Sequence, residues 1–263
     1  MCGIFCALSC HEPVWPPPVL QQLLEKRGPD SSSRKSFIAT GGTGIGEQTP
    51  PDTHVTFVST VLSLRGEVTV EQPYQTSTSR STLCWNGEAW TIGGAVPVGN
   101  DTNLVFRLLD EKEGALQQTH IDVAARLEQT TRRATVISER MSQIAGPYAF
   151  VYHDAEHGLL FYGRDFLGRR SLLTKLTDQG DMLITSVTDL TNSDGWSEVE
   201  ADGVYCVDLL RVMEHAVDGA AAAPYSPHTV SKVPYHCARD ACDAHCTPVG
   251  QPGLLMSSWL IVR

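Results

Sequence analysis

The chain has 263 residues, a hydrophobic content of 41%, a charged content of 19% and a formal net charge of −10 at pH 7. These values are typical of a soluble globular protein of one or two domains that can bury a sizeable core. The net negative charge argues against a surface that binds nucleic acid or anionic membranes. No stretch reaches the roughly 18 consecutive apolar residues of a transmembrane helix, and the first residues do not form a secretory signal.

The cysteines are expected to be reduced. The chain has 8 of them and no predicted secretory signal, so a disulfide framework is not indicated. Cys6, Cys10, Cys84 and Cys206 lie in apolar contexts, where a thiol acts as a small apolar side chain, and we expect them in the core. Composition and cysteine usage together predict a cytoplasmic protein.

The first elements along the chain are a predicted strand and a predicted helix. Gly3 to Leu8 is a short apolar run, which indicates a buried strand. Pro16-Pro17-Pro18 precedes leucines at helical spacing and predicts a helix start, because proline is tolerated in the first turn. Residues 31–53 are rich in Ser, Gly, Thr and Pro and predict a loop. His54 to Leu64 is β-branched and apolar and predicts a strand.

The middle of the chain predicts alternating groups of strands and helices. Ser81 to Trp90 predicts a hairpin whose turn contains Asn86-Gly87. Asn100-Asp101-Thr102 predicts the cap of a helix, and a second helix is expected over much of 119–142. Five later runs predict strands: 148–153, 159–162, 171–176, 182–186 and 204–209. This grouping indicates an α+β fold rather than regular βαβ alternation.

We predict one domain over residues 2–210 and an irregular tail over residues 211–263. The tail contains His236-Cys237, Cys242 and His245-Cys246, but it lacks the paired Cys-x2-Cys of structural zinc sites, so no metal site is predicted. We expect its composition to reflect a non-native or prematurely ended reading of a longer gene. Gly41 to Gly46 lacks the Gly-Lys-Ser/Thr ending of a P-loop, so no nucleotide site is predicted there.

Cys2 is the first candidate for chemistry. Methionine aminopeptidase removes an initiator Met that precedes a small residue, so the mature chain is expected to begin at Cys2, with a thiol and a free α-amine. A thiol of pKa ~8.5 is mostly protonated at neutral pH, and an amine of pKa ~7.7–8.0 beside it can act as its base. Taken alone, Met1 to Phe5 is equally compatible with a cysteine that fills an apolar strand.

Four further motifs accompany Cys2. They are Arg27-Gly28-Pro29-Asp30, Leu62-Ser63-Leu64-Arg65, Trp85-Asn86-Gly87-Glu88 and Gly163 to Arg170. The first, taken alone, indicates a helix end followed by a turn. The second ends an apolar strand in a cation that suits a carboxylate. The third offers an amide, a flexible backbone N–H and a carboxylate within three residues.

In this order, the motifs resemble the glutaminase domain of the class II glutamine amidotransferases, which are N-terminal nucleophile hydrolases. Within that group the sequence is most similar to asparagine synthetases. The resemblance covers about residues 2–210 and rests also on Val61 to Gly66, Asn100-Asp101-Thr102, Gly163 to Leu173, Trp196 to Val199 and Asp202-Gly203. It implies a four-layer αββα sandwich in which two mostly antiparallel sheets are covered by helices.

The resemblance also implies a reaction and a set of site residues. Glutamine would be hydrolysed to glutamate and ammonia through a thioester on the N-terminal cysteine. The implied residues are, for catalysis, Cys2, Asn86 and Gly87, and, for substrate binding, Arg65, Val68, Glu88 and Asp101. Asn86 and Gly87 would hold the oxyanion, and such a donor is typically worth ~2.7–4 kcal/mol of barrier. Arg65 would bind the substrate carboxylate, which an Arg fork suits better than Lys.

The implied hydrolysis needs no cofactor and no metal, and ATP and Mg²⁺ enter only if a synthetase domain is supplied elsewhere. Residues 211–263 match nothing of the Ser-Gly-Gly-x-Asp-Ser pyrophosphate loop of asparagine synthetases. A synthetase domain or polypeptide is therefore the implied ammonia acceptor, in the context of asparagine biosynthesis. Two alternatives stay open: a non-catalytic glutamine-binding or assembly module, and a fragment of a longer asparagine synthetase-like protein. Every mapped position holds a chemically competent residue, which favours the enzyme.

Overall fold

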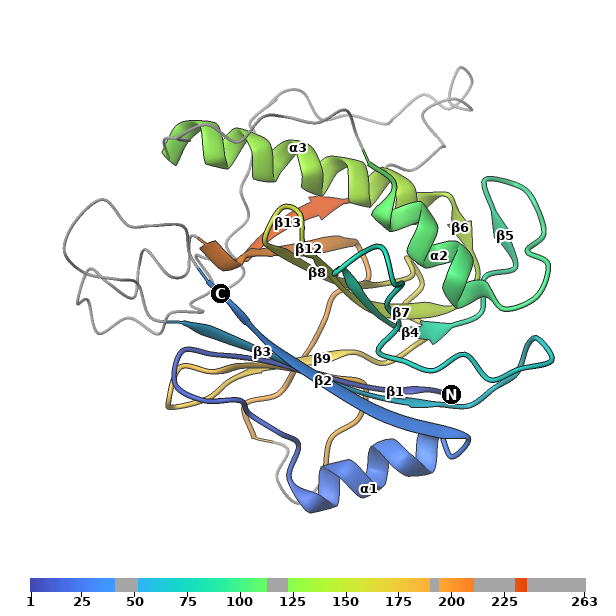
Figure 1. Ribbon diagram of the computed structural model, residues 1–263, viewed down its shortest axis with the longest axis horizontal. Helices are drawn as coiled ribbons and strands as arrows, with labels where there is room; N and C mark the ends of the chain where they lie inside the picture. Colours follow the sequence, from blue (N-terminus) through green and yellow to red (C-terminus); the bar gives the residue numbers. More distant parts are fainter. Residues whose placement is uncertain (41–51, 113–122, 190–193, 211–229, 236–263) are drawn as a thin grey trace, which may run out of the picture.

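The computed structural model describes residues 1–40, 52–112, 123–189, 194–210 and 230–235. Two β-sheets lie face to face, and helices lie against their outer faces (Figure 1). Within each of these two sheets, all neighbouring strands in the described ranges are antiparallel. No helix in those ranges is both long enough and apolar enough to cross a membrane.

The first sheet has six strands in the order β11-β9-β10-β1-β3-β2. These strands are β1 (Gly3–Ser9), β2 (Ser31–Ala39), β3 (Thr53–Val61), β9 (Leu173–Leu176), β10 (Met182–Thr185) and β11 (Ser197–Glu198). Helix α1 (Pro18–Arg27) covers the outer face of this sheet, where Leu20 and Leu24 pack against Phe5 of β1 and Val58 of β3 (Figure 1). Pro18 stands at the first helical position, as the sequence predicts.

The second sheet has five strands in the order β13-β12-β8-β7-β4. These strands are β4 (Thr82–Gly87), β7 (Tyr148–Asp154), β8 (Leu159–Arg164), β12 (Gly203–Asp208) and β13 (Val230–Pro234). Helices α2 (Asp101–Asp110) and α3 (Val123–Ser142) cover its outer face, where Val105 and Ile137 join the cluster of Trp85 and Phe150. A small sheet pairs β5 (Thr91–Ile92) with β6 (Ile144–Ala145).

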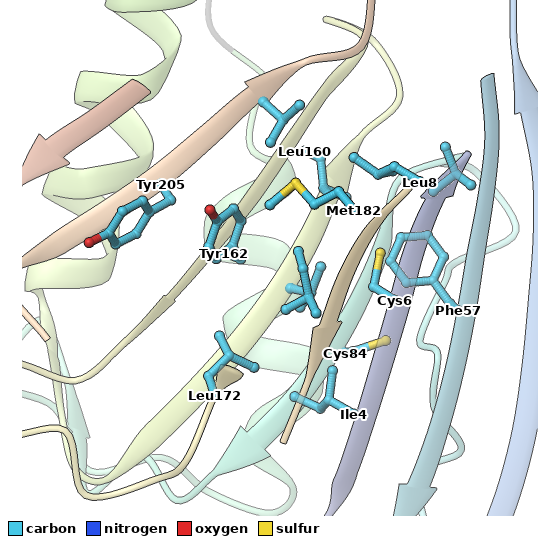
Figure 2. Packing of buried hydrophobic residues seen from close by; sticks show 14 of the residues in the cluster. Ile4, Cys6, Leu8, Phe57, Cys84, Leu160, Tyr162, Leu172, Met182 and Tyr205 are labelled. Atoms are coloured by element: carbon cyan, nitrogen blue, oxygen red, sulfur yellow. The ribbon is translucent and has the colours of Figure 1, made fainter. Parts of the chain in front are cut away.

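A continuous apolar core lies between the two large sheets. Successive side chains of a strand point to opposite faces, so Ile4, Cys6 and Leu8 of β1 enter this core while Phe5 faces α1. Figure 2 shows these three side chains in the same cluster as Cys84 of the second sheet. β1 is therefore buried on both faces, and the residue that precedes it is held at the edge of the core.

Most of the predicted elements after residue 100 are confirmed, with boundaries that shift by a few residues. Asn100 caps α2, and its side chain accepts a hydrogen bond from Thr102 N. The cysteines also agree in part with the prediction. Cys6, Cys84 and Cys206 are fully buried, whereas Cys10 is only partly buried at the margin of the core.

The loop predicted over residues 31–53 is wrong in its first part, because Ser31–Ala39 forms β2. This strand pairs with β3 along nine residues. Phe37 packs on Phe57 and His153, with ring centroids 6.1 and 4.3 Å apart. The ladder and these aromatic contacts outweigh the weak strand preference of the serines. Gly41 to Gly46 lies outside the described residues.

The hairpin predicted over residues 81–90 is also wrong. Asn86 and Gly87 end β4 and pair across the ladder with Ala149 and Tyr148 of β7. Glycine is needed at position 87 for lack of space, because a Cβ atom there would lie 2.7 Å from ring carbons of Trp85 and from Cβ of Tyr148. The Asn86 side chain is consequently fixed by a sheet, not by a turn.

The predicted irregular tail is corrected at residues 230–235. Val230–Pro234 forms β13, which pairs with β12 at the edge of the second sheet. Tyr235 then donates a hydrogen bond from its hydroxyl to Arg164 O at 2.5 Å. The folded domain therefore extends past residue 210. The Cys/His-rich residues 236–246 lie outside the described part of the chain.

Candidate active site

One cavity brings together side chains from five separate segments of the chain. Its walls come from the residues before β1, the loop after β3, the end of β4, the start of α2 and the loop after β8. Six of the seven predicted site residues line it: Cys2, Arg65, Asn86, Gly87, Glu88 and Asp101. Val68 does not line it, and its side chain is 75% exposed in the loop after β3.

The backbone beside Cys2 is held from two sides. On one side, Gly3 N donates to Thr60 Oγ1 at 3.1 Å, and Ser59 Oγ donates to Gly3 O at 3.1 Å. A Cβ atom on Gly3 would lie 2.4 Å from Thr60 Oγ1, so this close approach requires glycine. On the other side, Arg27 Nε donates to Cys2 O at 3.2 Å. These contacts fix the point at which the thiol enters the cavity.

The pKa of the Cys2 thiol and the pKa of the N-terminal amine are shifted in opposite directions. Burial raises the pKa of the Cys2 thiol, and the Asp101 charge acts in the same direction, while the backbone of Leu62 and the positive charges of the N-terminus and Arg27 oppose the shift. Burial lowers the pKa of the α-amine, which Met1 carries into the same cavity. A protonated thiol beside a neutral amine is the starting state for base-assisted attack.

Asn86 presents a hydrogen-bond donor that the fold does not use. Its side chain is 1% exposed, and its Nδ2 atom has no hydrogen-bond partner among the residues that the structure describes. Buried polar groups are normally paired, and leaving one unpaired costs about 1–3 kcal/mol. Because Asn86 lines the cavity with Cys2, this donor is available to an acceptor that is bound there.

Ala89 links two charged side chains that line the cavity, those of Arg65 and Asp101. Its N–H donates to Asp101 Oδ2 at 2.7 Å, and its carbonyl accepts from Arg65 Nη1 at 2.7 Å. Trp85 Nε1 also donates to Asp101 Oδ2, at 3.3 Å. Burial raises the pKa of the Asp101 carboxyl, and the two donors and the Arg65 charge oppose this shift. The carboxylate and the guanidinium are thus positioned through one backbone residue.

Glu88, together with Arg65 and Asp101, forms the charged wall of the cavity. Its backbone N–H donates to Pro147 O at 2.9 Å, and its carbonyl lies so close to Gly146 that a Cβ there would approach it to 2.1 Å. In the described part of the chain, the Glu88 carboxylate makes no hydrogen bond or ion pair. Its oxygens are therefore available to a cation in the cavity.

Sequence reasoning missed the roles of two arginines. Arg27 was interpreted only as a helix end, yet it binds the carbonyl of Cys2. Arg170 lines the cavity, and its buried Nε atom has no hydrogen-bond partner in the described ranges. Both residues belong to motifs that the sequence analysis singled out, and that membership was the signal that could have identified them.

Sequence comparison finds relatives that align with most of this chain. Asparagine synthetase domain-containing protein 1 of Gallus gallus is 34% identical over 221 residues, which are 80% of this chain and 29% of the relative. The protein of that name from Bos taurus is 30% identical over 215 residues, again 80% of this chain and 29% of the relative. The predicted resemblance to class II glutamine amidotransferases is confirmed. The chain spans less than a third of the length of these curated relatives.

A comparison with protein-family models finds no match, and the matches among solved structures are distant. Among solved structures, the glutamine phosphoribosylpyrophosphate amidotransferase from B. subtilis covers 89% of this chain and 49% of its own, with a TM-score of 0.43 and 14% identity. An allosteric regulatory enzyme of purine biosynthesis matches with a TM-score of 0.38 and 16% identity. Matches this distant carry no inference about function.

Proposed function

We propose that this chain is a glutaminase domain that hydrolyses glutamine to glutamate and ammonia through a thioester on Cys2. The observation that carries the proposal is the one cavity shared by Cys2, the unpaired Asn86 Nδ2 and the charged groups of Arg65, Glu88 and Asp101. We also propose the four-layer αββα sandwich of N-terminal nucleophile hydrolases for this domain, and the two antiparallel sheets with helices against them support it.

The proposed cycle begins with removal of Met1. This residue lines the cavity, so its loss both vacates space for a substrate and transfers the free amine to Cys2. The amine takes the thiol proton as Cys2 Sγ attacks the carboxamide carbon of glutamine. The carbonyl electrons move to the oxygen, and Asn86 Nδ2 and Gly87 N–H donate to the resulting oxyanion. The intermediate collapses when the amine returns the proton to the leaving nitrogen, which departs as ammonia. Water then hydrolyses the thioester and releases glutamate.

The charged wall of the cavity would select glutamine by its amino-acid end. Arg65 uses one nitrogen on Ala89 O, and its remaining N–H groups suit the α-carboxylate. The Glu88 and Asp101 carboxylates suit the α-ammonium. Two acids opposite one arginine match a zwitterionic end group, whereas a dicarboxylate product would meet more repulsion.

We further propose that the ammonia passes to a synthetase domain or polypeptide, as the name of the relatives suggests for those proteins. The hydrolysis itself uses only groups of this chain and water. A non-catalytic glutamine-binding module is the competing proposal, and retention of Met1 in the cavity would favour it.

The test compares Cys2→Ala with Cys6→Ala, because both change a buried thiol and only Cys2 lines the cavity. Glutamate release from glutamine is measured for the parent and both variants, and the intact mass shows whether Met1 has been removed. We expect Cys2→Ala to abolish glutamate release and Cys6→Ala to retain it. A glutamine-analogue electrophile should label Cys2 in the parent. Retained activity in Cys2→Ala, or an active chain that still carries Met1, would falsify the proposal.

A further inference from the structure

Two arginines from different parts of the fold lie near Met1 and Cys2, the residues at the start of the chain that line the cavity. Arg27 ends α1 and donates from Nε to Cys2 O at 3.2 Å and from Nη2 to Met1 Sδ at 3.7 Å. Arg170 follows β8 and lines the cavity beside Met1 and Cys2. The two guanidinium groups are close enough to repel each other, since the charge of Arg170 contributes, after burial, to lowering the pKa of Arg27.

Neither arginine is neutralised by a carboxylate within the described residues. The hydrogen-bond acceptors of Arg27 are Cys2 O, Ser171 Oγ and Met1 Sδ, all uncharged. The buried Nε of Arg170 has no acceptor in the part of the chain that the structure describes. Two uncompensated like charges in a half-buried position are unfavourable for the fold. They also disfavour any further positive charge nearby and favour a negative one.

The N-terminal amine lies within this field, because, in addition to burial, the charges of both arginines lower its pKa. The ionisable groups that face it or line the cavity with it are Cys2, Arg27, Asp30, Arg65, Glu88, Asp101 and Arg170. Burial is the largest cause that lowers the amine pKa, and the charges of Arg27 and Arg170 act in the same direction. Cys2 and, more weakly, the Asp30 carboxylate act in the opposite direction. Removal of Met1 would transfer the amine to Cys2, whose carbonyl Arg27 already binds.

We propose that Arg27 and Arg170 form a positioning pair whose positive field keeps the N-terminal amine unprotonated, so that it can accept the thiol proton of Cys2. This inference rests on the proposed glutaminase reaction and adds to it the control of the base. The same field favours the thiolate, so the proton leaves sulfur for nitrogen as the S–C bond forms. The amine then passes that proton to the leaving ammonia, and no other reactant is needed.

The experiment measures kcat/KM for glutamine hydrolysis from pH 5 to 9 in the parent, Arg170→Gln, Arg170→Lys and Asp30→Asn. The acid limb of this profile reports the base of the free enzyme. Arg170→Gln should move the limb to higher pH by roughly half to one unit, the size expected for one charge several ångströms away. Arg170→Lys keeps the charge and should leave the limb in place. Asp30→Asn should move it to lower pH, while its remaining oxygen still accepts from Ser63 N, which now donates to Asp30 Oδ2 at 2.7 Å.

A second readout separates this inference from the proposed function. The α-amine is titrated directly in the inactive Cys2→Ala background by its pH-dependent acetylation rate, with and without Arg170→Gln and Asp30→Asn. Opposite shifts in the two variants support the pair. An unchanged amine titration in both overturns it, even if glutamine is hydrolysed, and an equal shift in Arg170→Lys and Arg170→Gln overturns the role of charge. If Arg170→Gln does not fold, the sign of the Asp30→Asn shift decides. A parent that hydrolyses no glutamine refutes the proposed function, whatever the amine does.

Discussion

Asn86→Ala should separate catalysis from stability. The backbone of Asn86 stays in the ladder opposite Ala149, and its buried Nδ2 gives up no hydrogen bond because it has none. Truncation therefore removes an unpaired donor, whose presence costs about 1–3 kcal/mol, and leaves a small void that costs a similar amount. These two effects have opposite signs. We expect the free energy of unfolding to change by no more than about 1 kcal/mol.

The same substitution should slow hydrolysis strongly. Loss of one oxyanion donor raises the barrier by about 2.7–4 kcal/mol, which corresponds to a fall of roughly 10²–10³ in kcat. KM should change little, because the donor acts on charge that develops only in the transition state. Glutamate release is measured over a series of glutamine concentrations, and chemical denaturation is measured on the same preparation.

Asn103→Ala provides a matched control. Asn103 lies on α2 with its Oδ1 buried and unpaired, but it does not line the cavity. We expect its kcat to stay within about threefold of the parent, since it makes no contact with the reacting atoms. A folded Asn86→Ala variant with a kcat as high as that of Asn103→Ala refutes the oxyanion role.

Two further outcomes are expected. Arg65→Lys should lose the forked geometry and weaken glutamine binding by ~1–3 kcal/mol, which is measured as a raised KM. Alkylation of the thiol by a small neutral reagent should continue at the parental rate. A KM equal to that of the parent counts against the role of Arg65 in binding the substrate carboxylate. His153→Phe should abolish an acid-sensitive component of stability. Burial lowers the pKa of His153 to about 4, so the unfolded chain takes up a proton below pH ~6.5 that the folded chain refuses, and the parent should lose roughly 3 kcal/mol between pH 6.5 and 4. Denaturation curves at pH 7, 5.5 and 4 should show this slope in the parent alone, and an equal slope in the variant contradicts the assignment.

The sequence predicted those elements whose local signals and tertiary environment agree. The apolar run of β1 is buried on both faces, and the Asn100 cap starts α2 where it is expected. Where tertiary pairing overrides the local signal, the prediction was wrong. The serines of β2 form a strand because β3 offers a full ladder, and the Asn-Gly pair of residues 86 and 87 continues β4 because its partner is β7 and not the next segment.

The site was predicted better than the loops around it, for a topological reason. β1 and β3 are antiparallel, with Gly3 opposite Thr60, so the residue before β1 lies beside the end of β3. Site residues near the end of a regular element were placed in the cavity, as Asn86 and Asp101 were. Val68 lies well past the end of β3, where no ladder fixes the direction of a side chain, and it points to solvent.

The position of the Cys2 thiol and the positive charge around it are determined by different parts of the molecule. The ladder between β1 and β3 fixes where the nucleophile stands, and a side chain at Gly3 would disturb it because Thr60 Oγ1 leaves no room. The ladder contributes no charge, however, and burial, together with the Asp101 charge, raises the pKa of the Cys2 thiol. A buried thiol without a base would therefore be a weak nucleophile. The positive field must come from outside the two central strands, and Arg27 and Arg170 supply it from a helix end and from a loop. A change at Arg170 should thus alter the pH dependence of the reaction without moving the strand that carries the thiol, whereas a change at Arg27 would also remove its hydrogen bond to Cys2 O.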